Sequence, residues 1–171
     1  MKIKNRYFIK SSDIKKFQAE LHGIQLDSDT LFGKNSKMER GTLEDGTILY
    51  FINGELTFIE QDKRIFPFLR AILRNFIHLP KVVIDMGAIP YIIKGADVMF
   101  PGIRSVDPSI KKDDFVTIVD EKHDKPIAIG LALENGPDFS REKKGKGVKN
   151  IHYVGDKLWE FIKTVESKRS A

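Results

Sequence analysis

The chain of 171 residues contains no cysteine. It can therefore form no disulfide, no thiolate metal site and no cysteine nucleophile, so nothing indicates an oxidising compartment and we expect a cytoplasmic protein. It also lacks any run of the roughly 20 apolar residues that a membrane helix needs. The N-terminal segment MKIKNRYFIKSSD is charged too often to contain a signal-peptide core. These absences predict a soluble protein without a membrane partner.

Motifs for catalysis or cofactor binding are missing as well. The chain has neither a Walker-type phosphate loop nor a G-x-S-x-G elbow. The segment GKGVKN has only two of the three glycines of a dinucleotide fingerprint and precedes a predicted strand instead of a helix. The histidines are scattered without ligand spacing, at His22, His78, His123 and His152. We therefore expect no catalytic residue, no metal and no cofactor.

The acidic residues that could suggest chemistry have simpler explanations. Asp113 and Asp114 are adjacent, and adjacent residues of a strand point to opposite faces, so a solvated turn explains them better. Asp85 lies in the apolar segment VVIDMGA, where capping a helix is a better interpretation than catalysis.

The residues that are present predict a folded, basic protein. Hydrophobic residues make up 41% of the chain, which is enough to bury a sizeable core. The formal net charge is +5, and the sequence pI is about 9.3. A polyanionic partner is therefore worth testing.

The first 80 residues predict an α+β domain. The segment DIKKFQAELH has the apolar spacing of an amphipathic helix, with Ser11 or Ser12 as its N-cap and Gly23 after its end. Asn53-Gly54 between apolar runs predicts a hairpin with a type I′ turn and strands at 47–52 and 55–60. Pro67 is expected near the start of a second helix in RIFPFLRAILRNF.

Residues 81–171 predict a second domain, a small β-barrel or sandwich with short helices. Pro80 marks the boundary, and strands are expected in VVID, DFVTIVD, PIAIGLALE and NIHYV. The alternation in PIAIGLALE predicts a strand with one face on the core. Pro90 near the start and Gly95 after the end predict a short helix in AIPYIIKG. A final helix is expected after Asp156.

Two segments could contact a ligand. REKKGKGVK carries a local net charge of +4 and is either a solvated loop or an arm that contacts phosphates. KGADVMFPGIR contains glycines that allow close backbone approach and three apolar residues, Val98, Met99 and Phe100. Periodicity alone leaves open whether these three belong to the core or to a contact surface.

The segments VVIDMGAIPYIIKGADVMFPGI, DDFVTIVDEKHDKPIAIGLAL and KGKGVKNIHYVGDKLWEF resemble a PUA domain, a small RNA-binding pseudo-barrel. Upstream, FINGELTFIE and FPFLRAILRNF resemble the domain that precedes PUA in the malignant-T-cell-amplified-sequence family, relatives of ligatin that act in translation initiation and recycling. The absence of cysteine and the abundance of lysine are more similar to an archaeal member. The resemblance implies an α+β N-terminal domain followed by a PUA-type β pseudo-barrel.

The resemblance also implies a function without catalysis. A PUA domain of this family is expected to hold RNA on the small ribosomal subunit, either rRNA or the acceptor end of a tRNA. The N-terminal domain is expected to contact the ribosome or a protein partner. Lys94 and Arg104 would meet phosphates, Met99 and Phe100 would face bases, and Asp97 is expected to brace the turn. The expected RNA-binding residues are Lys94, Gly95, Ala96, Asp97, Val98, Met99, Phe100, Gly102, Arg104, Arg141, Lys143, Lys144, Lys146 and Lys149.

The sequence leaves two other functions open. The protein could be an accessory RNA-binding component of an RNA-modification system of the pseudouridine synthase or tRNA transglycosylase kind. It could also be a protein-interaction adaptor that retains only the PUA fold, because a fold does not guarantee its function.

Overall fold

The computed structural model describes residues 1–171 and divides into two compact units. The first unit comprises residues 1–78 together with 164–171, and the second comprises residues 79–163. The predicted domain ranges of 1–80 and 81–171 differ from these units at residues 79–80, which group with the second unit, and at the last eight residues, which group with the first. None of the helices combines the length and apolar character that crossing a membrane requires.

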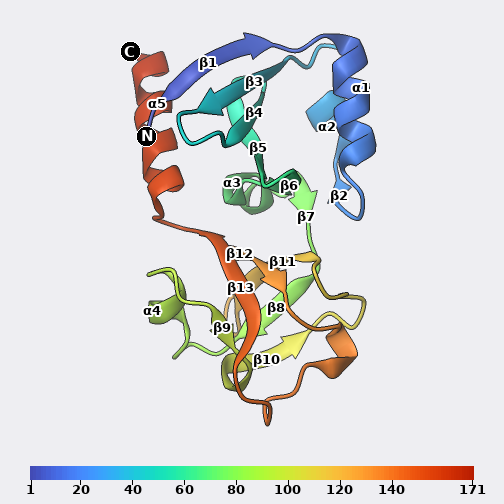
Figure 1. Ribbon diagram of the computed structural model, residues 1–171, viewed down its shortest axis with the longest axis vertical. Helices are drawn as coiled ribbons and strands as arrows, with labels where there is room; N and C mark the ends of the chain where they lie inside the picture. Colours follow the sequence, from blue (N-terminus) through green and yellow to red (C-terminus); the bar gives the residue numbers. More distant parts are fainter. The chain divides into compact units, whose positions relative to one another are not determined.

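The first unit contains one five-stranded antiparallel sheet, with strand order β1-β3-β4-β5-β6, and a small two-stranded sheet of β2 and β7 (Figure 1). Its strands are β1 (Ile3–Phe8), β2 (Gln25–Leu26), β3 (Met38–Leu43), β4 (Ile48–Ile52), β5 (Glu55–Gln61), β6 (Arg64–Pro67) and β7 (Ile77–His78). Its helices are α1 (Ser11–Glu20), α2 (Ser28–Phe32) and α3 (Leu69–Leu73). This arrangement confirms the predicted α+β architecture.

Local sequence signals explain several of these elements. Asn53 and Gly54 have φ angles of 52° and 86°, the positive values that a type I′ turn requires, so the predicted hairpin is confirmed as β4 and β5. Helix α1 is confirmed, but it begins at Ser11 with Lys10 as N-cap, and neither predicted serine caps it.

The second predicted helix of this unit is shorter than expected. Pro67 is the last residue of β6 and lies outside α3, whose N-cap is Phe68. Proline is tolerated there because β6 is an edge strand, where a missing N–H breaks no ladder on the open side. The helix ends at Leu73 because Asn75, with a φ of 60°, turns the chain.

The second unit is a six-stranded sheet with strand order β10-β8-β11-β12-β13-β9, and short helices accompany it (Figure 1). Its strands are β8 (Lys81–Ile84), β9 (Val98–Met99), β10 (Ile103–Val106), β11 (Phe115–Asp120), β12 (Pro126–Ala132) and β13 (Lys146–Tyr153). Its short helices are α4 (Ile89–Ile92) and the 3₁₀ turns η1 (Phe100–Gly102) and η2 (Gly136–Asp138). Helix α5 (Lys157–Ser170) begins in this unit. The predicted β pseudo-barrel with short helices is confirmed.

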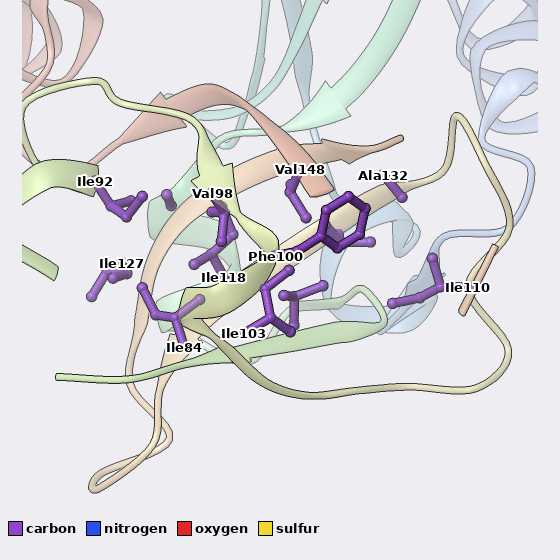
Figure 2. Close-up of a cluster of buried hydrophobic side chains, with 13 residues drawn as sticks. Ile84, Ile92, Val98, Phe100, Ile103, Ile110, Ile118, Ile127, Ala132 and Val148 are labelled. Carbon is purple, nitrogen blue, oxygen red and sulfur yellow. The ribbon is translucent and has the colours of Figure 1, made fainter. Parts of the chain in front are cut away.

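The core of the second unit is an apolar cluster inside the curved sheet (Figure 2). Ile118, Val82 and Val148 are fully buried within it. The strand predicted in PIAIGLALE is confirmed as β12, but both of its faces are buried, because Ala128, Gly130 and Ala132 are buried along with the isoleucines. A Cβ at Gly130 would lie 2.3 Å from Val148 Cγ1, so only a residue without a side chain lets β13 pack this closely.

Candidate nucleic-acid interface

Helix α4 and strand β9 line a groove with a volume of about 440 Å³ in the second unit. We call it the α4–β9 groove. Its walls are mostly small or apolar, with one acidic and one basic side chain. The lining residues are Ala88, Tyr91, Ile92, Gly95, Ala96, Asp97, Val98, Met99, Gly102 and Lys146.

The turn after α4 shapes the groove. Ile92 is only 2% exposed and anchors α4 to the core, whereas its neighbour Tyr91 is 68% exposed. Gly95 has a φ of 96°, and its N–H donates to Ile92 O at 3.0 Å. A Cβ there would lie 3.1 Å from the Tyr153 hydroxyl, so a side chain at position 95 would be both strained and crowded. Asp85 Oδ1 accepts from the Ala88 N–H at 2.9 Å, so it stabilises the turn that leads into α4, whereas the helix itself has Ala88 as N-cap and no side-chain cap.

The three apolar residues after this turn divide between core and surface. Val98 is 1% and Phe100 is 5% exposed, and both side chains belong to the core cluster (Figure 2). Phe100 also packs edge-on against Phe139, with ring centroids 5.6 Å apart. Phe100 therefore cannot present its ring to a base, which corrects the expectation for this residue. Met99, which points the other way from β9, is 46% exposed and does line the groove.

Asp97 braces the groove, as expected from the sequence. Its Oδ1 accepts from the Asn150 backbone N–H at 2.8 Å, and its Oδ2 lies 2.8 Å from Lys146 Nζ. Burial raises the pKa of Asp97, but these hydrogen bonds and the charges of Lys146 and Lys149 outweigh burial and hold it below its ordinary value. The carboxylate is therefore ionised at neutral pH, and each of its oxygens already has a hydrogen-bond partner.

Asn150 on β13 holds the turn between α4 and β9. Its side-chain Nδ2 donates to Ile92 O and to Ala96 O, both at 3.0 Å. Two carbonyl acceptors fix the orientation of the amide. The sequence did not identify Asn150 as a functional residue, and the only signal was a polar residue opening the strand motif NIHYV.

The other predicted site residues lie outside the groove lining. Lys94 follows α4 and is exposed, and Lys149 is exposed on β13. Arg104 Nε is 2.9 Å from Glu121 Oε2, so its charge is largely compensated. Arg141, Lys143 and Lys144 lie in the exposed turn before β13, where Lys143 Nζ is 5.5 Å from the centroid of the Phe100 ring. The basic segment is thus only partly a loop, because β13 already begins at Lys146.

The structure thus brings seven predicted residues into one groove, Gly95, Ala96, Asp97, Val98, Met99, Gly102 and Lys146. Three lining residues were absent from the predicted set, Ala88, Tyr91 and Ile92. Exposed Tyr91 is the most informative of them, and an aromatic residue in the predicted helix AIPYIIKG was its available signal.

We expect the turn before β13 to contribute salt-dependent RNA affinity. Replacing Lys143 and Lys144 with alanine should lower the slope of log affinity against log salt by about 1.4, because each contact to a single-stranded phosphate contributes roughly 0.7. Titrations of a single-stranded RNA between low and moderate salt would measure the slope. The double variant Lys111→Ala, Lys112→Ala, in another turn of the same unit, is the matched control. Equal slopes in wild type and the Lys143, Lys144 variant would remove this turn from the interface.

Residues 80–154 match the family model of the PUA domain. An uncharacterised protein of Methanocaldococcus jannaschii is 40% identical over 94% of this chain and 99% of its own length. Translation machinery-associated protein 20 of Schizosaccharomyces pombe is 34% identical over 78% of this chain and 77% of its own. Malignant T-cell-amplified sequence 2 of Homo sapiens is 28% identical over 93% of this chain and 92% of its own length.

The fold has a close counterpart among solved structures. A hypothetical protein from the archaeon Pyrococcus horikoshii superimposes with a TM-score of 0.73 and 34% sequence identity, over 92% of this chain and 99% of that one. The likeness extends through both units, and the relatives include archaeal proteins, as the sequence indicated. The chain belongs to the family of PUA-domain proteins that includes translation machinery-associated protein 20 and the malignant T-cell-amplified sequence proteins.

Proposed function

We propose that this protein is a non-catalytic RNA-binding factor of translation. In this proposal the α4–β9 groove holds a single-stranded RNA end, the acceptor end of a tRNA, on the small ribosomal subunit. The names of its relatives support a role in translation, and the groove itself supports the choice of ligand. Such a role would place the protein in the cytoplasm.

The groove has the properties that a single-stranded RNA end requires. Gly95, Ala96 and Gly102 leave the backbone accessible, so a ligand can approach it closely. Exposed Tyr91 and Met99 offer apolar surface on which unstacked bases can pack. Lys146 pairs with Asp97, but its side chain is 60% exposed and its ammonium has three N–H donors, so it can also donate to a phosphate at the same opening. The volume of the groove, about 440 Å³, suits a ligand of nucleotide size.

The carboxylate of the groove is not placed to act as a general acid or base. Asp97 is the one carboxylate in its lining, and hydrogen bonds from Asn150 and Lys146 occupy both of its oxygens. A catalytic base needs a carboxylate that is accessible to substrate and has a pKa near the working pH, whereas the pKa of Asp97 is lowered. These observations favour binding over catalysis.

The proposal is tested by comparing intact deacylated tRNA with the same tRNA lacking its single-stranded 3′ end. Wild-type protein should prefer the intact tRNA by about tenfold or more, since stacking contributes roughly 1–3 kcal/mol per base. Met99→Glu should abolish this preference, because it places a negative charge at the groove where phosphates pass. Fluorescence anisotropy at fixed salt would give the affinities.

Ser105→Glu is the matched control for this experiment. Ser105 is exposed on β10 in the same unit and lies outside the groove lining, so the variant adds the same charge elsewhere. It should retain the preference for the intact end. Wild-type protein that binds both tRNAs equally, or neither, would contradict the proposal and leave the adaptor hypothesis as the better explanation.

A further inference from the structure

A second cleft lies in the first unit, between α1 and the end of β1. Its volume is about 390 Å³. We call it the Arg40 cleft and define it by Tyr7, Phe8, Lys10, Lys16, Arg40 and Tyr50, which belong to its lining. None of these residues belongs to the α4–β9 groove.

The guanidinium of Arg40 is oriented by hydroxyl groups. Arg40 Nη1 donates to Thr42 Oγ1 at 3.1 Å and, more weakly, to the Tyr7 hydroxyl at 3.4 Å. The nearby Tyr50 hydroxyl donates its own proton to Glu60 at 2.6 Å. Arg40 forms no salt bridge with a carboxylate. Its positive charge is therefore held in place without being neutralised, which suits an incoming anion.

Tyr7 lies beside this charge, and Phe8 lines the same cleft. Tyr7 and Arg40 are direct partners in the pairing of β1 with β3. Tyr7 is 50% and Phe8 is 65% exposed, although large apolar side chains are usually buried in a folded core. Exposed aromatic rings next to a guanidinium form a surface on which a nucleobase can stack while its phosphate meets the cation.

The lining of the cleft carries three basic and two acidic side chains, a net charge of +1. Lys10 and Lys16 join Arg40 in its lining, and the acidic members are Asp13 and Glu20 on α1. Lys16 and Asp13 are 4.0 Å apart and more than half exposed, so their pairing is weak. The first 20 residues contain six lysines or arginines and two acids, and they form β1 and α1, which border the cleft.

We propose that the Arg40 cleft binds a nucleotide, with the phosphate on Arg40 and the base against Tyr7 or Phe8. The same chemistry is presented by a free mononucleotide and by one nucleotide of an RNA chain. A bidentate contact from a guanidinium to two phosphate oxygens is the strongest polar interaction available here. The proposal concerns a different unit from the α4–β9 groove and does not depend on tRNA binding there.

The test is an NMR titration of the full-length protein, observed through backbone amide resonances. The probes are adenosine 5′-monophosphate, inorganic phosphate, adenosine and a ten-nucleotide single-stranded RNA. Adenosine 5′-monophosphate should shift the resonances of Tyr7, Phe8 and Arg40 and bind at least tenfold more tightly than adenosine or phosphate alone. Arg40→Gln should weaken its binding about tenfold, because a charge-assisted hydrogen bond is lost.

Two further variants make the result decisive. Arg40→Lys keeps the charge but loses the forked geometry, so it should bind with intermediate affinity. Lys34→Gln removes an exposed positive charge of the same unit outside the cleft and should bind as wild type. Amide spectra of each variant would show that the fold is intact.

The titrations with adenosine 5′-monophosphate and with RNA also distinguish a free nucleotide from a nucleotide of an RNA chain. If the RNA shifts the cleft resonances and adenosine 5′-monophosphate displaces it, the cleft takes a nucleotide of an RNA chain. If only the mononucleotide shifts them, the ligand is a free nucleotide. The proposal would be overturned if neither adenosine 5′-monophosphate nor the RNA shifted these resonances. It would also be overturned if Arg40→Gln and wild type bound adenosine 5′-monophosphate with equal affinity. The resonances of Tyr91 and Met99 report on the α4–β9 groove separately, so failure of one site is distinguishable from failure of the other.

Discussion

Asn150→Ala is expected to reduce affinity for an intact tRNA acceptor end by at least tenfold and to lower the free energy of unfolding by about 2 kcal/mol. The variant removes the Nδ2 donor that serves Ile92 O and Ala96 O, both at 3.0 Å. These carbonyls belong to opposite ends of the turn that shapes the groove. Without the donor, the turn loses its tie to β13 and with it the geometry that a ligand needs.

Asn150→Asp should have the larger effect. It has almost the same shape, but it places a carboxylate oxygen where Nδ2 faced two carbonyl oxygens, which replaces two attractions with two repulsions. In both variants the backbone N–H of residue 150 still serves Asp97, so any loss is due to the side chain. Urea unfolding followed by circular dichroism and tRNA anisotropy would measure the two quantities.

Asn135→Ala is the control for Asn150. Asn135 Oδ1 accepts from the Lys112 N–H at 3.0 Å, in a turn that contributes nothing to the groove lining. Its loss should destabilise the second unit by about 1 kcal/mol without changing tRNA affinity. If Asn150→Ala binds tRNA as tightly as Asn135→Ala does, then the side chain of Asn150 does not position the groove.

The parts of this structure that sequence predicted are those fixed by neighbouring residues. Asn53-Gly54 determines its own turn because both residues tolerate positive φ, and Gly95 does the same after α4. The helix after Asp156 could likewise be predicted, since an N-cap needs only an acceptor and the N–H groups that follow it. Errors at Pro67 and at the N-cap of α1 shifted boundaries and left the elements in place.

The site itself was predicted only in part, because contacts between distant residues complete it. Asn150 is 58 residues from Ile92, and no local pattern indicates that they meet. The pairing of Lys146 with Asp97 likewise depends on the antiparallel register of β13 with β9. That register also decides that Val98 faces the core while Met99 faces the groove. Alternation predicts that neighbours point opposite ways, but it does not say which of them points inward.

Asp156→Ala is expected to lower the free energy of unfolding by about 3 kcal/mol, the second large effect. Asp156 Oδ1 accepts from the Trp159 N–H at 2.8 Å and caps α5. Its Oδ2 accepts from the Tyr153 N–H at 3.1 Å and lies 2.6 Å from Nδ1 of His152, which is 2% exposed. The variant therefore removes a helix cap and a hydrogen-bond partner of a buried imidazole together.

The stabilising effect of Asp156 should depend on pH in a defined direction. Burial raises the pKa of Asp156, but the hydrogen bond and charge of His152 and the N–H groups of Trp159 and Tyr153 outweigh it, so the pKa is lowered. A carboxyl group with a lower pKa in the folded state stabilises the fold above its unfolded pKa, which is about 3.9, and loses this contribution as the pH falls through the folded value. The stability difference between wild type and Asp156→Asn, which keeps an acceptor but not the charge, should thus be full at pH 6 and shrink below about pH 4. Urea unfolding of both proteins across this range would measure it, and a difference that stays constant with pH would show that the charge of Asp156 does not stabilise the fold.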